Sequence, residues 1–383
     1  MEKKAFVIST NILSPLGNTC DQNFIHLKKG NSGIRLNDIP EIWSEEFHAS
    51  LFDKDIERDL DNRINTHSSQ KYTKFEKLLI DSINTAIGDC SIEVKSDRTI
   101  FLISTTKGNI GLLENANNLD IERVSLHRSA KLVADYFGNP NKPLVISNAC
   151  ISGVLAIVTA KRLIQSGMYD YAIVVGADLI TRFILSGFYS FQAISEEPCK
   201  PFDKSRNGIT LGEAAGTIIL SAFANSESDN IYISGGAITN DANHISGPSR
   251  TGEELSYSIN KTLEEASVRS EDVDFISLHG TATIYNDEME ANAINLSNLQ
   301  DVSANSMKGY FGHTLGAAGI IETIISIYSM KNSLILPTIG FNEYGLTKQI
   351  NISQKLQNKA LYNCLKTASG FGGCNASLLI SKN

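Results

Sequence analysis

Short runs of β-branched residues alternate along the chain with longer stretches whose apolar positions recur at helical spacing. The runs predict buried strands, and the stretches predict amphipathic helices. Strands that alternate with helices in this way favour βαβ units and a largely parallel sheet. In the first part of the chain, the predicted strands are 4–9, 99–104, 144–146 and 171–176, and the predicted helices are 72–89, 129–136 and 150–165. The stretch 34–71 is polar and irregular, so we predict no regular element there.

The same plan starts again near residue 230 and continues to the end of the chain. Predicted strands lie at 231–236 and 273–278, predicted helices at 255–266 and 316–330, and a predicted hairpin at 362–380. The run 302–305 precedes a glycine-rich turn. The repetition indicates an ancient duplication, with an N-terminal half at 1–225 and a C-terminal half at 226–383. The polar stretch 222–230 would hold the boundary between the two halves.

Composition excludes several classes of protein. The 383 residues carry a net charge of −8, which disfavours nucleic acid as a partner on electrostatic grounds. The six cysteines are widely spaced without a C-x-x-C pair, so neither a disulfide framework nor a metal site is expected. The apolar run near the N-terminus is too short for a signal peptide, and no stretch is long enough to span a membrane. We therefore expect a cytoplasmic protein.

Cys150 lies where a predicted strand turns sharply into a predicted helix. The free N–H groups and positive dipole end of a helix favour an anion, and cysteines at such places have lowered pKa values. This placement predicts a thiolate nucleophile. A free cysteine is also often a small buried core residue, so other residues must decide between the two interpretations.

Two histidines, an ion pair and a glycine-rich turn add candidate chemistry. His279 ends a predicted strand, and His313 lies in a turn flanked by glycines. Each could instead be a hydrogen-bonded structural histidine. Glu322 lies on a very apolar predicted helix and should therefore pair with a cation, for which Lys308 is the nearest candidate in sequence, unless both face solvent.

The run Gly370-Phe-Gly-Gly could present backbone N–H groups to an oxyanion, or it could simply close a hairpin. Together with a cysteine nucleophile and two histidines, it indicates a carbon–carbon condensation. The thiolate would take an acyl group, and neutral imidazoles would stabilise the enolate formed as a malonyl group loses carbon dioxide.

At this point the chain resembles the elongating β-ketoacyl-acyl-carrier-protein synthases of the thiolase superfamily, over essentially its whole length. The resemblance rests on five motifs, which are Asn148-Ala-Cys-Ile-Ser-Gly, Pro201-Phe-Asp-Lys-Ser-Arg-Asn-Gly with Leu211-Gly-Glu-Ala-Ala-Gly, His279-Gly-Thr-Ala-Thr with Asn286-Asp, Lys308 to His313 with Glu322, and Gly370-Phe-Gly-Gly-Cys-Asn. It implies an α/β, thiolase-like, five-layered αβαβα fold built from two duplicated halves. It also implies an acyltransferase that works without a cofactor or metal.

The resemblance further implies a role for each matching residue. Cys150 would carry the acyl group, His279 and His313 would support decarboxylation and condensation, and Lys308 with Glu322 would hold the network together. The backbone N–H groups of Cys150 and Phe371 would form the oxyanion hole, with Phe371 as a gate. The residues expected to shape the acyl pocket and its loop are Asn109, Ile110, Gly370, Gly372 and Gly373.

The implied partners are an acidic acyl-carrier protein, which usually docks on a local basic patch, and a second copy of the chain in a homodimer. A heterodimer with a chain-length-factor-like subunit is the alternative, as catalytic subunit or as that factor itself. Such factors lack the cysteine, a thiolase would carry its second cysteine before the last glycine run, and an initiating synthase would have Asn where His313 stands.

Two departures from the family pattern put housekeeping fatty-acid elongation in doubt. Ala282 and Cys374 replace a usual glycine and threonine. The Ala282 form is similar to synthases of polyene pigment pathways, of the aryl polyene or flexirubin type.

Overall fold

A ten-stranded sheet forms the centre of the computed structural model, which describes residues 3–64, 70–114, 121–224, 230–242 and 247–383. The strand order is β11-β10-β14-β15-β9-β1-β8-β6-β4-β5. The strands of the first half are β1 (Ala5–Leu13), β4 (Thr99–Ser104), β5 (Leu144–Ile146), β6 (Tyr171–Asp178) and β8 (Ala214–Ser221). Those of the second half are β9 (Ile231–Asn240), β10 (Phe275–Ser277), β11 (Ala304–Asn305), β14 (Asn363–Gly370) and β15 (Cys374–Lys382).

The two halves of the sheet repeat one topology. In each half the first strand, at the centre of the sheet, pairs antiparallel with the last strand. The last strand pairs antiparallel with the next strand toward the edge of the sheet, and the remaining two pairs are parallel. The halves join through β1 and β9, where Ala5 lies opposite Ile233 and Phe6 opposite Tyr232. The duplication expected from the sequence is therefore confirmed in the order and direction of the strands.

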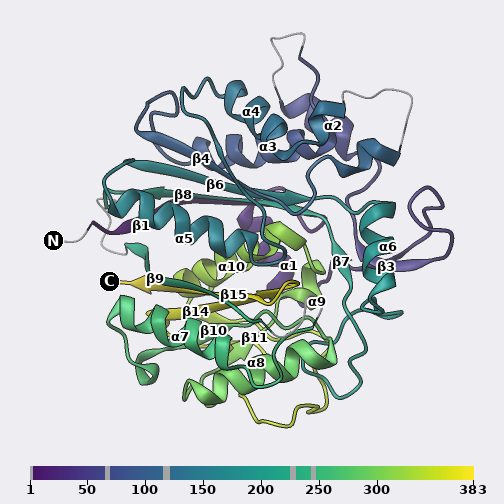
Figure 1. The fold of residues 1–383 in the computed structure, drawn as a ribbon, viewed down its shortest axis with the longest axis vertical. Helices are drawn as coiled ribbons and strands as arrows, with labels where there is room; N and C mark the ends of the chain where they lie inside the picture. The colour runs from purple at the N-terminus through teal and green to yellow at the C-terminus, as the bar shows by residue number, and fades with distance from the viewer. Residues whose placement is uncertain (1–2, 65–69, 115–120, 225–229, 243–246) are drawn as a thin grey trace.

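Helices cover both outer faces of the sheet and fill the space between its two halves, which gives the five expected layers (Figure 1). One outer layer holds α2 (Ile56–Arg63), α3 (Lys74–Gly88) and α4 (Leu126–Tyr136), and the other holds α7 (Glu253–Ala266) and α8 (Ile284–Leu296). The central layer holds α5 (Ser152–Gln165) and α10 (Ala318–Asn332). The central helices are screened from water except near their C-terminal ends, where Arg162, Lys331 and Asn332 are exposed, and most of their residues are apolar or small.

The two central helices touch through glycines near their N-termini. A Cβ atom at Gly153 would stand 2.8 Å from the backbone nitrogen of Ile320, and one at Gly319 would stand 2.6 Å from that of Val154. Real Cβ atoms do not approach other atoms so closely, so only glycine allows this backbone contact. The contact fixes the start of α5, and with it the turn that carries Cys150, against the start of α10.

The main predicted elements are confirmed, with ends shifted by a few residues. The stretch 34–71, predicted to be irregular, instead holds β2 (Arg35–Asn37), β3 (Phe47–Ser50) and α2. These elements are short, and β3 pairs with the distant β7 (Leu211–Gly212). The local hydrophobic pattern therefore does not predict them. Sequence reasoning also missed three helices, α1 (Cys20–Lys28), α6 (Arg182–Ser190) and α8.

The remaining elements are short connections. They are the two-residue strands β12 (Leu334–Ile335) and β13 (Gln357–Asn358), the helix α9 (Lys308–Phe311), and the 3₁₀ turns η1 (Ile110–Glu114), η2 (Ile121–Val124), η3 (Ser270–Asp272) and η4 (Leu315–Ala317). The expected boundary between residues 225 and 226 lies outside the described residues. Within the described ranges, no helix has the length and apolarity needed to cross a bilayer.

Candidate active site

A cavity of about 430 Å³ opens beside Cys150, His279 and His313. The cysteine Sγ and one ring nitrogen of each histidine all lie within 4.8 Å of one another. The three side chains come from both halves of the chain and meet near the contact between α5 and α10. The structure therefore brings together the three groups that the sequence singled out as reactive.

Cys150 lies in a tight turn between β5 and α5. Ala149 has a left-handed backbone, with φ of +45°, and the Ser152 hydroxyl fixes the turn by accepting from the Asn148 N–H (2.8 Å) and donating to the Ala149 carbonyl (2.6 Å). The first residue of α5 is Ser152, two positions after the thiol. The strand-to-helix turn predicted for the cysteine is confirmed.

The prediction of a lowered cysteine pKa is wrong. The pKa of Cys150 is raised to about 12, mainly by burial and to a smaller extent by the nearby Cys374 and Asp178. Lys308 and the backbone N–H of Phe371 lower the pKa, but they do not offset the loss of solvation. The resting group is a neutral thiol, so it must lose a proton as it attacks a substrate.

Hydrogen bonds of its backbone groups hold His279 in place. It follows β10, and its N–H and that of Gly280 donate to the two carboxylate oxygens of Glu290, at 2.7 and 2.8 Å. Its carbonyl accepts from Lys308 Nζ at 2.9 Å. The ring is buried, and among the described residues its Nδ1 has no hydrogen-bond partner.

The tautomer of His313 follows from one backbone contact. Its Nδ1 accepts the Leu315 N–H at 3.2 Å, so the proton of the neutral ring lies on Nε2. Within the described part of the chain Nε2 has no partner, which leaves it available as a donor. Cys150, His279 and His313 are close enough to hold a metal ion, but Nε2–H has no lone pair to offer one. The arrangement suits hydrogen-bond donation better than metal binding.

Both imidazoles are kept neutral. Burial lowers the pKa of His279 well below 6.5, and the charges of Lys308 and Lys366 and the neighbouring His313 ring add to the effect. Burial likewise lowers the pKa of His313, again with help from Lys308 and Lys366. The ring planes lie edge to face, with centroids 5.3 Å apart and an interplanar angle of 83°.

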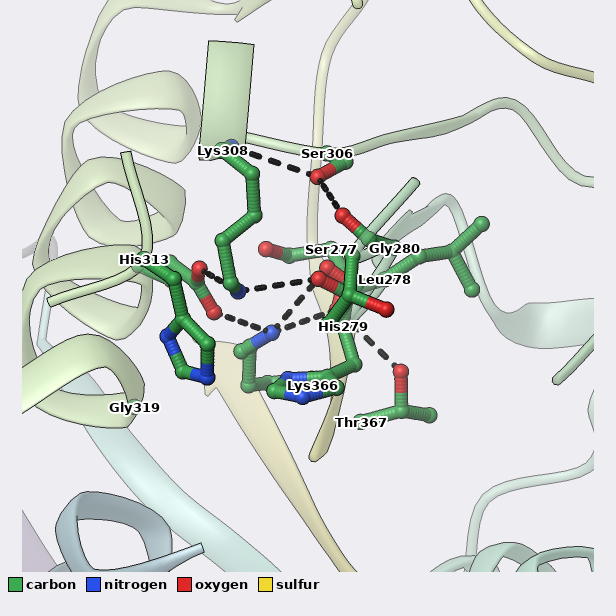
Figure 2. Close-up of polar contacts among 12 residues, drawn as sticks. Ser277, Leu278, His279, Gly280, Ser306, Lys308, His313, Gly319, Lys366 and Thr367 are labelled. Carbon is green, nitrogen blue, oxygen red and sulfur yellow. Dashed lines mark hydrogen bonds and ion pairs between the residues drawn. The ribbon is translucent and has the colours of Figure 1, made fainter. Parts of the chain in front are cut away.

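The buried ion pair expected between Lys308 and Glu322 is present. Lys308 Nζ donates to Glu322 Oε1 at 2.5 Å, and both side chains are almost fully buried, so the solvent-exposed alternative is excluded. A second lysine, Lys366 on β14, lies 2.7 Å from Glu322 Oε2. Figure 2 shows both ammonium groups beside the carbonyl groups of the strand that leads to His279.

The glycine-rich run closes the hairpin of β14 and β15, and it also borders the cavity. The Phe371 N–H faces the Cys150 sulfur. Its ring packs on Phe188 and Phe191, with centroids 5.7 and 5.0 Å away. The lining of the cavity includes all three predicted loop glycines, Gly370, Gly372 and Gly373.

Asn109 and Ile110 do not line this cavity. Asn109 is buried, and its amide donates to Glu76 Oε1 and Ser129 Oγ, at 3.0 and 2.8 Å. Ile110 borders a separate surface hollow next to α6. In one chain, therefore, the segment expected to shape the acyl pocket lies apart from Cys150.

Sequence reasoning missed three buried charged residues at the site. Lys366 is one, and Glu290, which also accepts from Thr367 Oγ1 at 2.5 Å, is the second. The third is Asp178, whose carboxylate accepts from Thr105, Thr106, Lys107 and Gly316 and so fixes the loop after β4 to the turn before α10. The lysine within the apolar run of β14 could have been used to predict a buried, paired charge, in the same way as Glu322 on its apolar helix.

Comparison with known proteins agrees with this geometry. Residues 3–224 match the beta-ketoacyl synthase N-terminal domain, and residues 231–342 match its C-terminal domain. The chain is 28% identical to 3-oxoacyl-[acyl-carrier-protein] synthase 2 of Staphylococcus aureus, over 99% of this chain and 98% of the relative. The corresponding protein of Vibrio cholerae is 27% identical, over 100% of this chain and 99% of its own.

Solved structures show the same fold. The ishigamide ketosynthase/chain length factor superposes with a TM-score of 0.88 at 22% identity, covering 100% of this chain and 99% of that one. The ketosynthase ApeO in complex with its chain length factor ApeC, from Xenorhabdus doucetiae, gives a TM-score of 0.81 at 23% identity, covering 100% and 98%. Given the matching domains and the full-length relatives, this chain belongs to the beta-ketoacyl synthase family.

Proposed function

We propose that the protein condenses an acyl thioester with a malonyl thioester on acyl-carrier protein, through an acyl-Cys150 intermediate. The observation that carries the proposal is the close grouping of one thiol and two neutral imidazoles around a single cavity. Each group supplies a part of the reaction that the others cannot.

Acylation comes first. Cys150 attacks the carbonyl carbon of the acyl thioester, and its proton passes to the imidazole of His279, which can accept it because the lowered pKa keeps the ring unprotonated. The bond between the acyl carbon and the carrier's sulfur breaks, and the imidazole returns the proton to the leaving thiolate. The result is an acyl-Cys150 thioester and a free carrier thiol.

Decarboxylation follows with the second carrier. The bond between the malonyl methylene and carboxylate carbons breaks, carbon dioxide leaves, and the electron pair forms an enolate. The Nε2–H of His313 donates to the enolate oxygen, together with a ring N–H of His279. The enolate carbon attacks the acyl-Cys150 carbonyl, the tetrahedral intermediate expels the Cys150 thiolate, and that thiolate takes up a proton.

The tetrahedral oxyanion needs donors of its own. We assign these to the backbone N–H groups of Cys150 and Phe371, because the Phe371 N–H already faces the sulfur. Phe371 would act as a gate by leaving its packing against Phe188 and Phe191 when an acyl chain enters. Gly372 and Gly373, both with positive φ, give the loop the required freedom.

Partners follow from the surface of the cavity and the edge of the sheet. The lining includes three exposed apolar side chains, Phe191, Ile284 and Tyr285, and none of its described members is a lysine or arginine. We therefore propose that the carrier's thioester arm enters through an apolar opening, with any basic docking patch outside this lining. Strand β5 forms a sheet edge, which suits pairing with a second copy or with a chain-length-factor-like subunit.

The pathway would be fatty-acid elongation or a specialised polyene or polyketide route. Ala282 supports the specialised route. Its backbone has a φ of +63°, a left-handed conformation that is strained for alanine but not for glycine. Intact-mass analysis after incubation with carrier proteins bearing saturated and polyunsaturated acyl chains would separate the two. Preferential loading of polyunsaturated chains supports the specialised route, and preferential loading of long saturated chains refutes it.

The reaction itself is tested with Cys150→Ala, and Cys90→Ala is the matched control. Cys90 is a half-buried free cysteine at the end of α3, with a pKa likewise raised by burial, to about 11. Cys150→Ala should lose acyl loading and 3-oxoacyl product, whereas Cys90→Ala should keep both. Full condensation by Cys150→Ala would refute the proposed mechanism.

A further inference from the structure

Lys366 is a fully buried lysine on β14, beside the candidate site. Its Nζ lies 2.7 Å from Glu322 Oε2 and donates to the carbonyl groups of Ser277 and Leu278, at 3.2 and 3.3 Å (Figure 2). These carbonyls belong to the end of β10 and the residue that leads into His279. Lys366 therefore touches both the ion pair and the segment that positions a histidine.

The surroundings of Lys366 indicate that it is charged. Its Nζ donates to two backbone carbonyl groups and lies 2.7 Å from Glu322 Oε2, a contact with the distance of an ion pair but not the geometry of a hydrogen bond. A neutral amine would leave this buried carboxylate oxygen with no positive charge beside it. Such a loss is costly in the interior, so the protonated form fits the surroundings best.

The local charges do not cancel at Glu322. Its single carboxylate lies between two ammonium groups, Lys308 on α9 and Lys366 on β14. The other carboxylate facing Lys366 is Glu290 on α8, whose oxygens already accept from two backbone N–H groups and a threonine hydroxyl. The second lysine thus adds positive charge beside both imidazoles, on top of what a simple lysine–glutamate pair would supply.

We propose that Lys366 is a positioning residue, which holds Glu322 and the end of β10 in place and adds positive charge that, together with burial and Lys308, favours the neutral donor form of His279 and His313. The proposal rests on the role of the two histidines in decarboxylation given above. A neutral imidazole loses this role when it takes up a proton in acid. Without the second ammonium group, protonation should occur at higher pH, because one repulsive charge has been removed.

The test compares two buried lysines. Lys366→Met removes the charge and keeps the length of the side chain, and Lys161→Met does the same on α5, where Lys161 is fully buried and pairs with Glu265 at 2.6 Å. The rate of carbon dioxide release from malonyl-carrier protein is measured for each variant from pH 5 to 9. Lys366→Met should shift the acidic limb of this profile upward by about one pH unit, and so lose about tenfold on that limb.

Lys161→Met should lower the urea midpoint but leave the acidic limb of the decarboxylation profile where it is in the native enzyme. If the limb of Lys366→Met coincides with that of the native enzyme, the proposal is overturned. Should Lys366→Met prove insoluble, Lys366→Gln replaces it, and NMR titration of labelled histidine rings gives the same comparison without activity. Failure of the native enzyme to release carbon dioxide would instead refute the proposed function, so the two outcomes are distinct.

Discussion

Gly153→Ala should destabilise the protein at the contact between the two central helices. The added Cβ would lie 2.8 Å from Ile320 N, 3.0 Å from Gly316 O and 3.1 Å from the Gly319 Cα. All three neighbours are backbone atoms, which cannot rotate away, so the helices must move apart. Overpacking of this kind costs about 1–3 kcal/mol, and the better helix propensity of alanine returns at most about 1 kcal/mol. We therefore expect a net loss of about 2 kcal/mol in the free energy of unfolding.

Urea unfolding at one fixed protein concentration measures this loss, with Gly88→Ala as the control. Gly88 is also helical, but a Cβ there would have nothing within 4 Å, so its replacement should leave stability unchanged or slightly raised. Because Gly153 lies three residues after the nucleophile, condensation should also fall, by up to about 100-fold if the thiol moves by 1 Å. Equal midpoints and equal rates for the two variants would refute the reasoning.

Three further predictions concern the site. The rate at which iodoacetamide alkylates Cys150 should keep rising with pH beyond pH 9, because burial raises the thiol's pKa to about 12, and a plateau reached near pH 7 would contradict this. His279→Ala and His313→Ala should each slow carbon dioxide release from malonyl-carrier protein by about 100-fold or more, and normal release in both would remove them from that role. Glu322→Gln should lower the free energy of unfolding by about 3 kcal/mol in urea titration, since it removes the carboxylate that pairs with two buried ammonium groups, and an unchanged midpoint would count against this account.

Much of the fold could be predicted because its signals are local. The strands β4 and β6 are continuous apolar runs, and the helices α3 and α7 have clear amphipathic periods, so their positions follow from the pattern. The hairpin of β14 and β15 was also predictable, because the glycines between two apolar runs indicate a turn.

What could not be predicted depends on contacts between distant segments. Strand β3 lies between β2 and β7 in a small sheet, and its pairing with β7, more than a hundred residues later, is not encoded in any local pattern. The pKa of Cys150 was predicted in the wrong direction because the dipole of a helix is visible in the sequence, whereas the depth of burial is not. The lysine within the apolar run of β14 could have indicated a buried charge, but its pairing with Glu322, a residue of a distant helix, could not be predicted from the sequence.

The crossing of α5 and α10 has a consequence for the synthesis of the protein. Helix α5 leaves the ribosome long before α10 is made, and at about 5–20 residues per second the delay is about 10–30 s. During that time the apolar side chains of α5 that will pack on α10, such as Val154, have no permanent cover. A nascent chain in this state is prone to aggregation, so a chaperone that shields the first half should raise the yield of the folded enzyme. The layer that brings the reactive groups together is thus also the layer that is completed late.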